Sequence, residues 1–255
     1  MERGKPVVGF FSFTCCEGCE FTVLFLDELL ELFDKLDIQY FHLIKEKNAE
    51  TDFDLAFVEG AISSKHEMRE LKRIRAKSKY LVAFGECAAH GGIPAMRNQL
   101  KRRALGKYIY SQKLARDWIE VSPISDFVKV DYFMYGCPII KDEFIQFISQ
   151  FIKGEKPKEF RGPVCLECPR RGKPDCYMLN KIECLGPITN GGCNALCIRN
   201  NMPCTLCRGP LENADLYAEI RLLESFGISK KEAINKIRRF GSKELKESKH
   251  GRKNH

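Results

Sequence analysis

The sequence predicts a doubly wound α/β domain followed by a cysteine-rich segment that needs bound metal to fold, and two observations carry this prediction. Over residues 1–153, short apolar runs alternate with amphipathic stretches, which is typical of a parallel sheet covered by helices. Residues 164–210 lack apolar periodicity and are rich in Gly, Pro, Asn and Cys. Such a segment buries little hydrocarbon, so we expect metal binding to supply its folding free energy.

The elements of the first domain follow from hydrophobic periodicity. We expect strands at the short apolar runs 7–11, 38–44, 55–58, 80–84 and 127–132. We expect helices where apolar side chains recur every three or four residues, at 21–36, 66–77 and 142–152. Residues 154–163 contain Gly and Pro and are interpreted as a linker.

A helical tail is predicted after the cysteine-rich segment, over residues 211–255. Apolar spacing predicts helices at 216–226 and 229–240, and Ser229 with Glu232 fits a capping box at the start of the second helix. The last fifteen residues are polar and basic, and we expect them to be disordered.

The thirteen cysteines form a scattered group and a packed group. The scattered group follows the predicted strands 7–11, 80–84 and 127–132, and consists of Cys15, Cys16, Cys19, Cys87 and Cys137. Ligands bind at the carboxyl edge of open parallel sheets, so we expect these thiols to converge there. A single buried cysteine would be an ordinary core residue, but four at one edge are hard to obtain by chance.

The packed group lies in residues 164–210 and consists of Cys165, Cys168, Cys176, Cys184, Cys193, Cys197, Cys204 and Cys207. A 4Fe–4S cluster takes four thiolates, so twelve cysteines suit three clusters, with one cysteine left over. The spacing matches no common ferredoxin run or zinc finger, and it leaves open which four residues serve which cluster. Two four-cysteine zinc ribbons are the alternative.

The composition of the chain bears on its cellular compartment and on the kinds of partner it binds. The start of the chain lacks the apolar stretch of a secretory signal, and no apolar run is long enough to span a bilayer. We therefore expect a cytoplasmic protein with no direct membrane insertion, in which metal is favoured over disulfides, although hyperthermophilic cytosols do contain disulfides. The net charge of +8 lies largely in 101–103 and 230–255, and no aromatic interleaving or nucleic-acid motif accompanies it, so we expect no nucleic-acid partner.

Three short motifs occur in a fixed order in the α/β part: Cys16-Glu17-Gly18-Cys19, then Gly85-Glu86-Cys87 with Gly91-Gly92, then Gly136-Cys137-Pro138. This ordered set resembles the cluster-binding pattern of the small subunits of nickel–iron hydrogenases and of the related 20 kDa subunit of complex I. The resemblance implies a flavodoxin-like domain whose proximal 4Fe–4S cluster is held by Cys16, Cys19, Cys87 and Cys137. The complex I relatives use adjacent cysteines, so Cys15 with Cys16 is an alternative pair that would leave Cys19 spare.

Glu20 directly follows the second cysteine of the first motif. Hydrogenases often carry an acidic residue close behind that cysteine, which suggests a part in proton traffic. The simpler interpretation, which we prefer, is an acid near a helix N-terminus that interacts favourably with the helix dipole.

The packed cysteines carry a second resemblance. Cys184-Leu185-Gly186-Pro187, Gly192-Cys193 and Pro203-Cys204-x-x-Cys207-Arg208-Gly209-Pro210 are similar to the carboxyl-terminal part of cytosolic hydrogenase small subunits. These include the sulfhydrogenase delta subunit and the gamma subunits of archaeal viologen- and deazaflavin-reducing hydrogenases. The resemblance implies medial and distal 4Fe–4S clusters. The eight packed cysteines would be their ligands.

The function that these resemblances imply is electron transfer. Electrons would pass through three clusters between the nickel–iron centre of a large-subunit partner and an acceptor subunit that carries flavin or further clusters. The chain has no dinucleotide fingerprint, P-loop or nickel-type cysteine pairs, so we expect no catalytic residue of its own. A quinone-linked, complex I-like subunit is one alternative, and a zinc-stabilised nucleic-acid-binding protein is the other.

Overall fold

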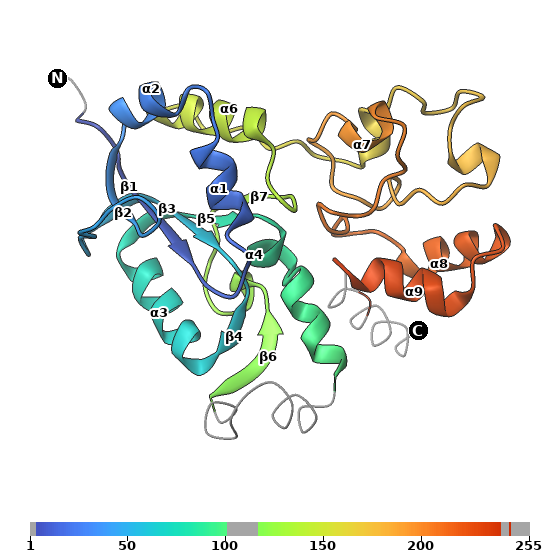
Figure 1. Cartoon of the computed structure of the whole chain (residues 1–255), viewed down its shortest axis with the longest axis horizontal. Helices are drawn as coiled ribbons and strands as arrows, with labels where there is room; N and C mark the ends of the chain where they lie inside the picture. The colour runs from blue at the N-terminus through green and yellow to red at the C-terminus, as the bar shows by residue number, and fades with distance from the viewer. Residues whose placement is uncertain (1–3, 101–116, 241–244, 246–255) are drawn as a thin grey trace. The chain divides into compact units, whose positions relative to one another are not determined.

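The structure is a computed structural model, which describes residues 4–100, 117–240 and 245 (Figure 1). The chain divides into two compact units, Met1–Lys158 and Glu159–His255. Each unit has its own core of buried apolar side chains. Among the described residues, no helix is both long and apolar enough to cross a membrane.

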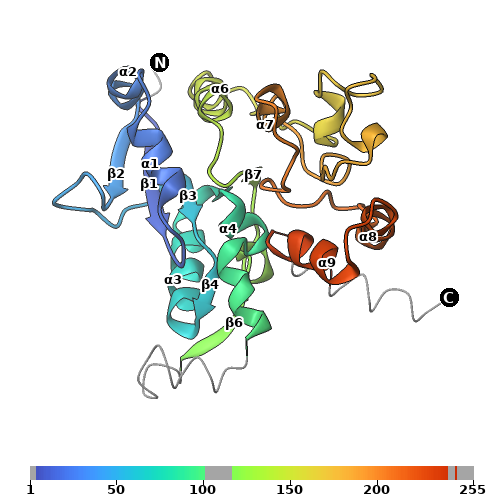
Figure 2. The ribbon, with the colours of Figure 1, turned by 45° about the vertical axis from the view of Figure 1, so that its right-hand side comes forward.

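The first unit is built on a five-stranded sheet with the order β2-β1-β3-β5-β7. Figure 2 shows β2, β1 and β3 of this sheet in that order from left to right. The strands are β1 (Val7–Ser12), β2 (Asp37–Phe41), β3 (Phe53–Glu59), β5 (Ser78–Phe84) and β7 (Tyr132–Met134). All neighbouring strands in this sheet are parallel. Counted within the sheet alone, the order is 2-1-3-4-5, which is that of flavodoxin-like folds, and the predicted fold class is confirmed.

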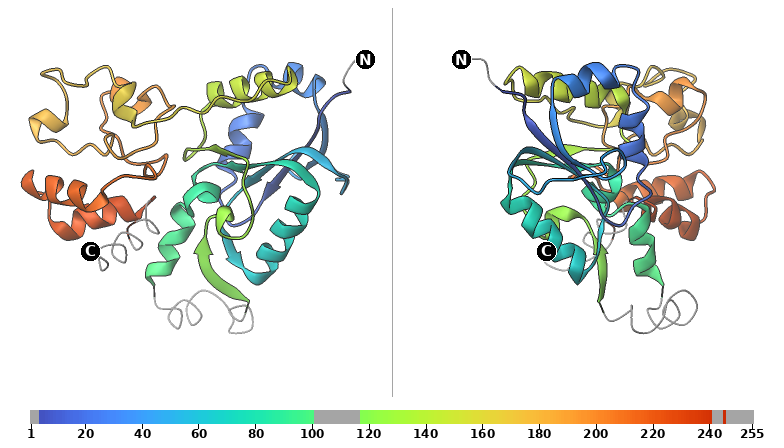
Figure 3. Two further views of the ribbon diagram at one scale, coloured as in Figure 1. Left: turned by 180° about the vertical axis from the view of Figure 1, so that it is seen from behind. Right: turned by 60° about the vertical axis from the view of Figure 1, so that its left-hand side comes forward.

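Both faces of the sheet are covered, because the central strands are apolar on both sides. On one face Phe10 stacks on Phe57 with ring centroids 4.8 Å apart, and Phe144 packs beside them. Helices α1 (Gly18–Leu24), α2 (Leu29–Asp34) and α6 (Lys141–Ile152) cover this face. Helix α3 (Lys65–Ala76) covers the other face (Figure 3). Its side chains Leu71 and Ile74 are buried against the sheet there. The helices expected at 66–77 and 142–152 are thus confirmed.

Helix α3 begins with a complete capping box that the sequence analysis did not identify. The Ser64 hydroxyl accepts a hydrogen bond from the Glu67 N–H at 3.2 Å, and the Glu67 carboxylate accepts one from the Ser64 N–H at 3.0 Å. Each such bond satisfies an N–H that has no partner inside the helix. The box therefore fixes where α3 starts, directly after β4 (Ile62–Ser64).

The single helix expected over 21–36 is wrong, because the segment forms two short helices. Helix α1 ends at Leu24, and α2 begins at Leu29. The Lys141 ammonium, from α6, donates a hydrogen bond to the Phe25 carbonyl just past the end of α1. Apolar periodicity could not reveal this break, because Lys141, which bonds to the chain there, lies more than a hundred residues away in the sequence.

The strand expected over 127–132 is wrong in its bounds. Residues Phe127 and Val128 instead donate hydrogen bonds to the Ile124 carbonyl, which continues the turn η3 (Ile124–Asp126). The chain joins the sheet only where the Asp131 N–H bonds to the Leu81 carbonyl, and β7 follows. A further strand, β6 (Trp118–Ser122), pairs antiparallel with β4 and was not predicted.

The second unit contains little regular structure before its two terminal helices. Its cysteine-rich part holds only the one-turn elements η4 (Val164–Leu166), η5 (Met178–Asn180) and α7 (Leu196–Arg199). Helices α8 (Leu216–Ser225) and α9 (Lys230–Arg238) follow and pack against each other. Residues 154–163 contain neither helix nor strand, as expected for a linker.

The tail contains a capped helix and a buried residue near its end. The Ser229 hydroxyl accepts a hydrogen bond from the Glu232 N–H at 3.3 Å, so Ser229 caps α9, which confirms one half of the predicted capping box. Leu245 lies in the stretch expected to be disordered, yet it is buried and its carbonyl accepts a hydrogen bond from the Tyr217 hydroxyl. The other residues of that stretch lie outside the described part of the chain.

Candidate metal centres

The scattered cysteines meet at the carboxyl edge of the sheet. Cys15 and Cys16 follow β1, and Cys19 lies in the first turn of α1. Cys87 lies in α4 (Glu86–His90), directly after β5, and Cys137 follows β7. The turns after β5 and β7 are joined by two hydrogen bonds of 2.8 Å, from the Gly85 N–H to the Met134 carbonyl and from the Glu86 N–H to the Gly136 carbonyl.

Glycines leave the space in which these thiols sit. Gly85 has φ of +87°, and a Cβ placed on it would lie 2.3 Å from the Cys19 sulfur. A Cβ on Gly92, where φ is +47°, would lie 3.0 Å from the Cys87 backbone nitrogen and 3.1 Å from its sulfur. Any larger residue at Gly85 would occupy the place of the Cys19 sulfur.

The pKa shifts of the scattered thiols indicate that these thiols lie close together. Burial is the largest cause that raises the pKa of Cys19, and the Cys87 and Cys137 thiols raise it further. Burial also raises the pKa of Cys87 and Cys137, and each is raised further by Cys16. Four thiolates are unfavourable here unless positive charge compensates them, and a metal centre supplies that charge and deprotonates its thiol ligands. The donor set therefore fits a cluster with four thiolate ligands.

Cys15 lies at the same edge. Burial, followed by the Glu59 carboxylate, raises its pKa to about 12, and Cys15 in turn raises the pKa of Cys87. The structure thus brings together five thiols where the leading interpretation requires four.

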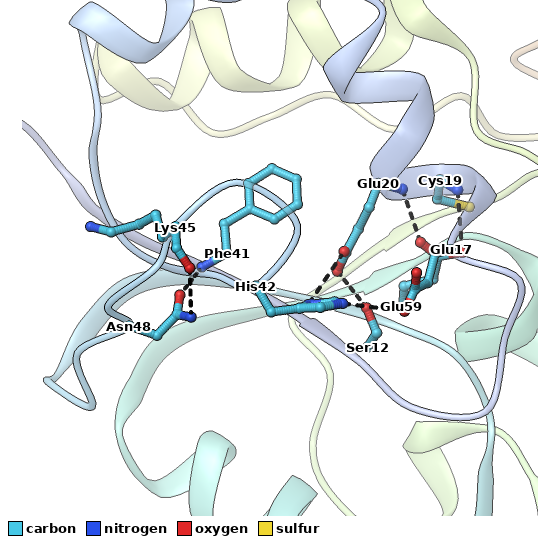
Figure 4. A network of polar contacts seen from close by, with 9 residues as sticks. All are labelled: Ser12, Glu17, Cys19, Glu20, Phe41, His42, Lys45, Asn48 and Glu59. Carbon is cyan, nitrogen blue, oxygen red and sulfur yellow. Dashed lines mark hydrogen bonds and ion pairs between the residues drawn. The ribbon is translucent and has the colours of Figure 1, made fainter.

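Glu59, which the sequence analysis missed as a site residue, positions Cys19. It is the last residue of β3 and is almost fully buried. Its carboxylate accepts hydrogen bonds from the Cys19 N–H at 3.2 Å and the Glu20 N–H at 2.9 Å, so it caps the start of α1 (Figure 4). Glu59 ends an apolar strand at Gly60, but sequence alone does not show that its side chain turns toward α1.

Glu20 lies in the first turn of α1, as expected, and its side chain is fully buried. The Ser12 hydroxyl donates a hydrogen bond of 2.7 Å to its carboxylate, and the His42 ring lies 3.8 Å from it. The other nitrogen of His42 lies 3.2 Å from the half-exposed Glu17 carboxylate, so a row of polar side chains runs from the interior to the surface (Figure 4). Burial raises the pKa of Glu20 to about 7. A part for Glu20 in proton traffic stays a prediction.

In the second unit, two of the first four packed cysteines, Cys165 and Cys184, lie beside Gly186. A Cβ on Gly186 would lie 3.5 Å from both the Cys165 and the Cys184 sulfur. Burial raises the pKa of Cys165 to about 11, and the thiols that raise it further are those of Cys184, Cys168 and Cys176. These four cysteines therefore share one location.

The other four packed cysteines lie in the two chain segments that follow. Burial raises the pKa of Cys204 to about 12, and the Cys184 and Cys207 thiols raise it further. Cys193 precedes α7 and Cys197 lies within it, and the Leu196 N–H donates a hydrogen bond to the Cys193 carbonyl at 3.2 Å.

Glu167, also missed by the sequence analysis, links the segment of Cys165 and Cys168 to the segment of Cys193. It lies between Cys165 and Cys168 in the chain, and its carboxylate accepts hydrogen bonds of 3.0 Å from the Gly192 and Cys193 N–H groups. Its signal in the sequence is only its place between two cysteines, and that place does not reveal which N–H groups it reaches.

Within the described residues, no three His, Cys, Asp or Glu side chains are arranged to hold a single metal ion. Each thiolate ligand of a 4Fe–4S cluster binds a different iron atom, so the four thiolates need not converge on one point.

The sequence is similar to a respiratory-complex subunit family and to subunits of hydrogenases. The family model of the NADH ubiquinone oxidoreductase 20 Kd subunit matches residues 16–151. The sulfhydrogenase 2 delta subunit of Pyrococcus furiosus is 35% identical, over 91% of this chain and 98% of its own length. A subunit of the F420-non-reducing hydrogenase vhu of Methanocaldococcus jannaschii is 34% identical, over 81% of this chain and 83% of its own length.

A solved structure agrees with these relatives. The structure of an NAD+-reducing [NiFe]-hydrogenase in the H2-reduced state contains a chain with a TM-score of 0.54 and 25% identity, covering 60% of this chain and 94% of that one. Fold and sequence together define the class of the protein as a subunit of an oxidoreductase complex. The chain belongs to the family of the 20 kDa subunit of NADH:ubiquinone oxidoreductase and its hydrogenase relatives, as the sequence motifs predicted.

Proposed function

We propose that the chain is the electron-transfer small subunit of a cytoplasmic nickel–iron hydrogenase and that it carries three 4Fe–4S clusters. The observation that carries the proposal is the convergence of cysteines from three separate strand ends at one edge of the sheet, together with eight more in the second unit. Twelve thiols in three groups of four match the ligand requirement of three clusters.

We assign the proximal cluster to Cys16, Cys19, Cys87 and Cys137. The mutual effects of these thiols on each other's pKa support the assignment, and so does the space that Gly85 leaves beside the Cys19 sulfur. Cys15 then remains as a neighbour that is not a ligand. In the second unit, we assign one cluster to Cys165, Cys168, Cys176 and Cys184, and the other to Cys193, Cys197, Cys204 and Cys207. The electrostatic interactions within the first of these sets support that division.

When bound, such clusters accept and release electrons one at a time at potentials that the surrounding protein sets. The chain's own residues would hold and tune them. Glu59 fixes the turn that presents Cys19, through its hydrogen bonds to the first turn of α1. Glu167 holds the loop that presents Cys193 in the same way. Backbone N–H groups that point at cysteine sulfur raise the potential of a cluster.

The chemistry at hydrogen belongs, in this proposal, to a partner. The solved structure that resembles this chain comes from a [NiFe]-hydrogenase, so the proposed partner is a large subunit with a nickel–iron centre. A second partner, carrying flavin or further clusters, would accept the electrons.

Hydrogen-dependent reduction tests this function. The chain would be purified without oxygen together with the proteins that bind it, and then exposed to H2. We expect a nickel-containing subunit to co-purify and the iron–sulfur absorption to bleach under H2 but not under argon. A complex that contains no nickel, or whose absorption does not change under H2, would overturn the proposal.

The match to the 20 kDa subunit family favours a second candidate, a quinone-linked subunit of a complex I-like enzyme. That match ends at residue 151 and does not include the eight packed cysteines. Reduction of the clusters by H2 in the absence of quinone distinguishes the two, because only the hydrogenase candidate predicts it.

A further inference from the structure

Arg208 has the largest fully buried side chain among the described residues, with 1% of its surface exposed. A guanidinium stays charged under all physiological conditions, and burying it is costly unless nearby groups compensate its charge. Arg208 directly follows Cys207, the last cysteine of the chain. A permanent positive charge is therefore buried beside a set of thiols.

Hydrogen bonds hold Arg208 between the two segments that supply the second set of four cysteines. Its Nε donates to the Asn190 carbonyl at 3.2 Å and to the Gly191 carbonyl at 2.9 Å, shortly before Cys193 in the chain. The Asn190 side-chain amide donates back to the Arg208 carbonyl at 3.1 Å. These contacts connect the segment of Cys207 to the segment of Cys193.

We propose that Arg208 raises the reduction potential of the cluster held by Cys193, Cys197, Cys204 and Cys207, an inference that rests on the proposed function. Reduction adds one negative charge to a cluster, and a nearby cation stabilises the reduced form more than the oxidised form. The effect is large where the cation is buried, because the low dielectric of the interior screens it weakly. Net charge and solvent exposure are known determinants of cluster potentials.

Glu167 acts in the opposite direction at the same place. Its carboxylate lies 3.0 Å from the Cys193 N–H and 3.5 Å from the Cys193 sulfur. Arg208 bonds to the Gly191 carbonyl, two residues before Cys193, and the Glu167 carboxylate lies against the Cys193 sulfur itself. The two substitutions that remove these charges should therefore shift the potential of this cluster in opposite directions.

The test is a redox titration of full-length holoprotein, followed by electron paramagnetic resonance. In Arg208→Gln, we expect the ratio of reduced to oxidised form of one cluster to fall about tenfold at a fixed potential, which is a downward shift of about 59 mV for a one-electron couple. The other two clusters should keep their potentials. Glu167→Gln should shift the same cluster upward, and Arg208→Lys, which keeps the charge, should stay near the wild type.

Arg199→Gln is the matched control. Arg199 is an exposed cation that bonds to Asn194, in the same loop as Cys193, so solvent should screen its charge and the shift should be small. An Arg208→Gln protein that keeps all its iron with unchanged potentials would overturn the inference. Loss of this cluster in both Arg208 variants would overturn it too, because Arg208 would then be needed for assembly. A wild-type protein that lacks this cluster would instead contradict the proposed function.

Discussion

The backbone N–H of Cys204 donates a hydrogen bond to the sulfur of Cys184, with 3.4 Å between nitrogen and sulfur. A second bond of 3.0 Å runs between the same segments, from the Leu185 N–H to the Cys204 carbonyl. We assign these two cysteines to different clusters, so the contact makes the two proposed clusters immediate neighbours. Short separations of this kind are what an electron relay requires.

The proposed division of the packed cysteines predicts that two substitutions remove two different clusters. Cys176→Ser and Cys197→Ser should each remove about four iron atoms per chain, and each should abolish a different paramagnetic signal. Iron analysis and electron paramagnetic resonance of the two purified variants check this. If both substitutions abolish the same signal, the division is wrong.

The proximal assignment predicts different results for two cysteines that lie close together. Cys137→Ser should lose the proximal cluster, about four iron atoms, and leave the second unit folded with its own clusters. Cys15→Ser should keep the full iron content, because Cys15 is not a ligand in our assignment. If Cys15→Ser loses about four iron atoms and Cys19→Ser keeps them, the adjacent pair Cys15 and Cys16 binds the cluster.

Gly85→Ala should also prevent the proximal cluster from assembling. The added Cβ would lie 2.3 Å from the Cys19 sulfur, in a conformation with φ of +87° that side chains rarely adopt. Gly172→Ala is the control, since Gly172 has φ of +69° but nothing within 4 Å of the added carbon. We expect Gly172→Ala to retain all its iron at a strain cost of about 1 kcal/mol. Equal iron content in the two variants would contradict the close packing at Gly85.

The buried carboxyl of Glu219 should make the stability of the folded protein depend on pH. This residue of α8 is 5% exposed, one of its carboxylate oxygens has no hydrogen-bond partner, and burial raises its pKa from 4.5 to about 7. A raised pKa means that the folded state favours the protonated form of Glu219. The contribution of Glu219 to the free energy of unfolding is therefore full below pH 4.5 and is lost as the pH rises to 7. The cost of ionisation grows by about 1.4 kcal/mol per pH unit in that window.

Glu219→Gln removes this ionisation, so its melting temperature should exceed that of the wild type by more at about pH 8.5 than at about pH 5.5. Glu224→Gln, on the exposed side of the same helix, should show no such change with pH. Thermal melts of the three holoproteins at both pH values test this. A pH-independent difference for Glu219→Gln would refute the raised pKa.

The elements that the sequence predicted well are those whose pattern is local. Strands β1, β3 and β5 and helices α3 and α6 carry their own apolar periodicity, and the ends of β1 and β5 located the motifs of Cys16 and Cys87 correctly. The errors involve distant partners. The break between α1 and α2 has Lys141 beside it, and β6 pairs with β4, a strand far away in the sequence.

The same limit applies to the site. Cysteine spacing singled out the candidate ligands, because four-thiolate chemistry has a recognisable composition, and their binding of clusters stays a prediction. The charged residues that surround the thiols have no such signature. Glu59, Glu167 and Arg208 are ordinary charged residues in the sequence, and only the fold shows that each is directed at a cysteine loop.

The most direct test of the account is the content of iron, acid-labile sulfide and zinc per chain in protein purified without oxygen. We predict about twelve iron atoms, an equal amount of sulfide and no zinc. About four iron atoms with two zinc ions would contradict it, because the cysteine-rich segment would then be a structural zinc module that carries no electrons.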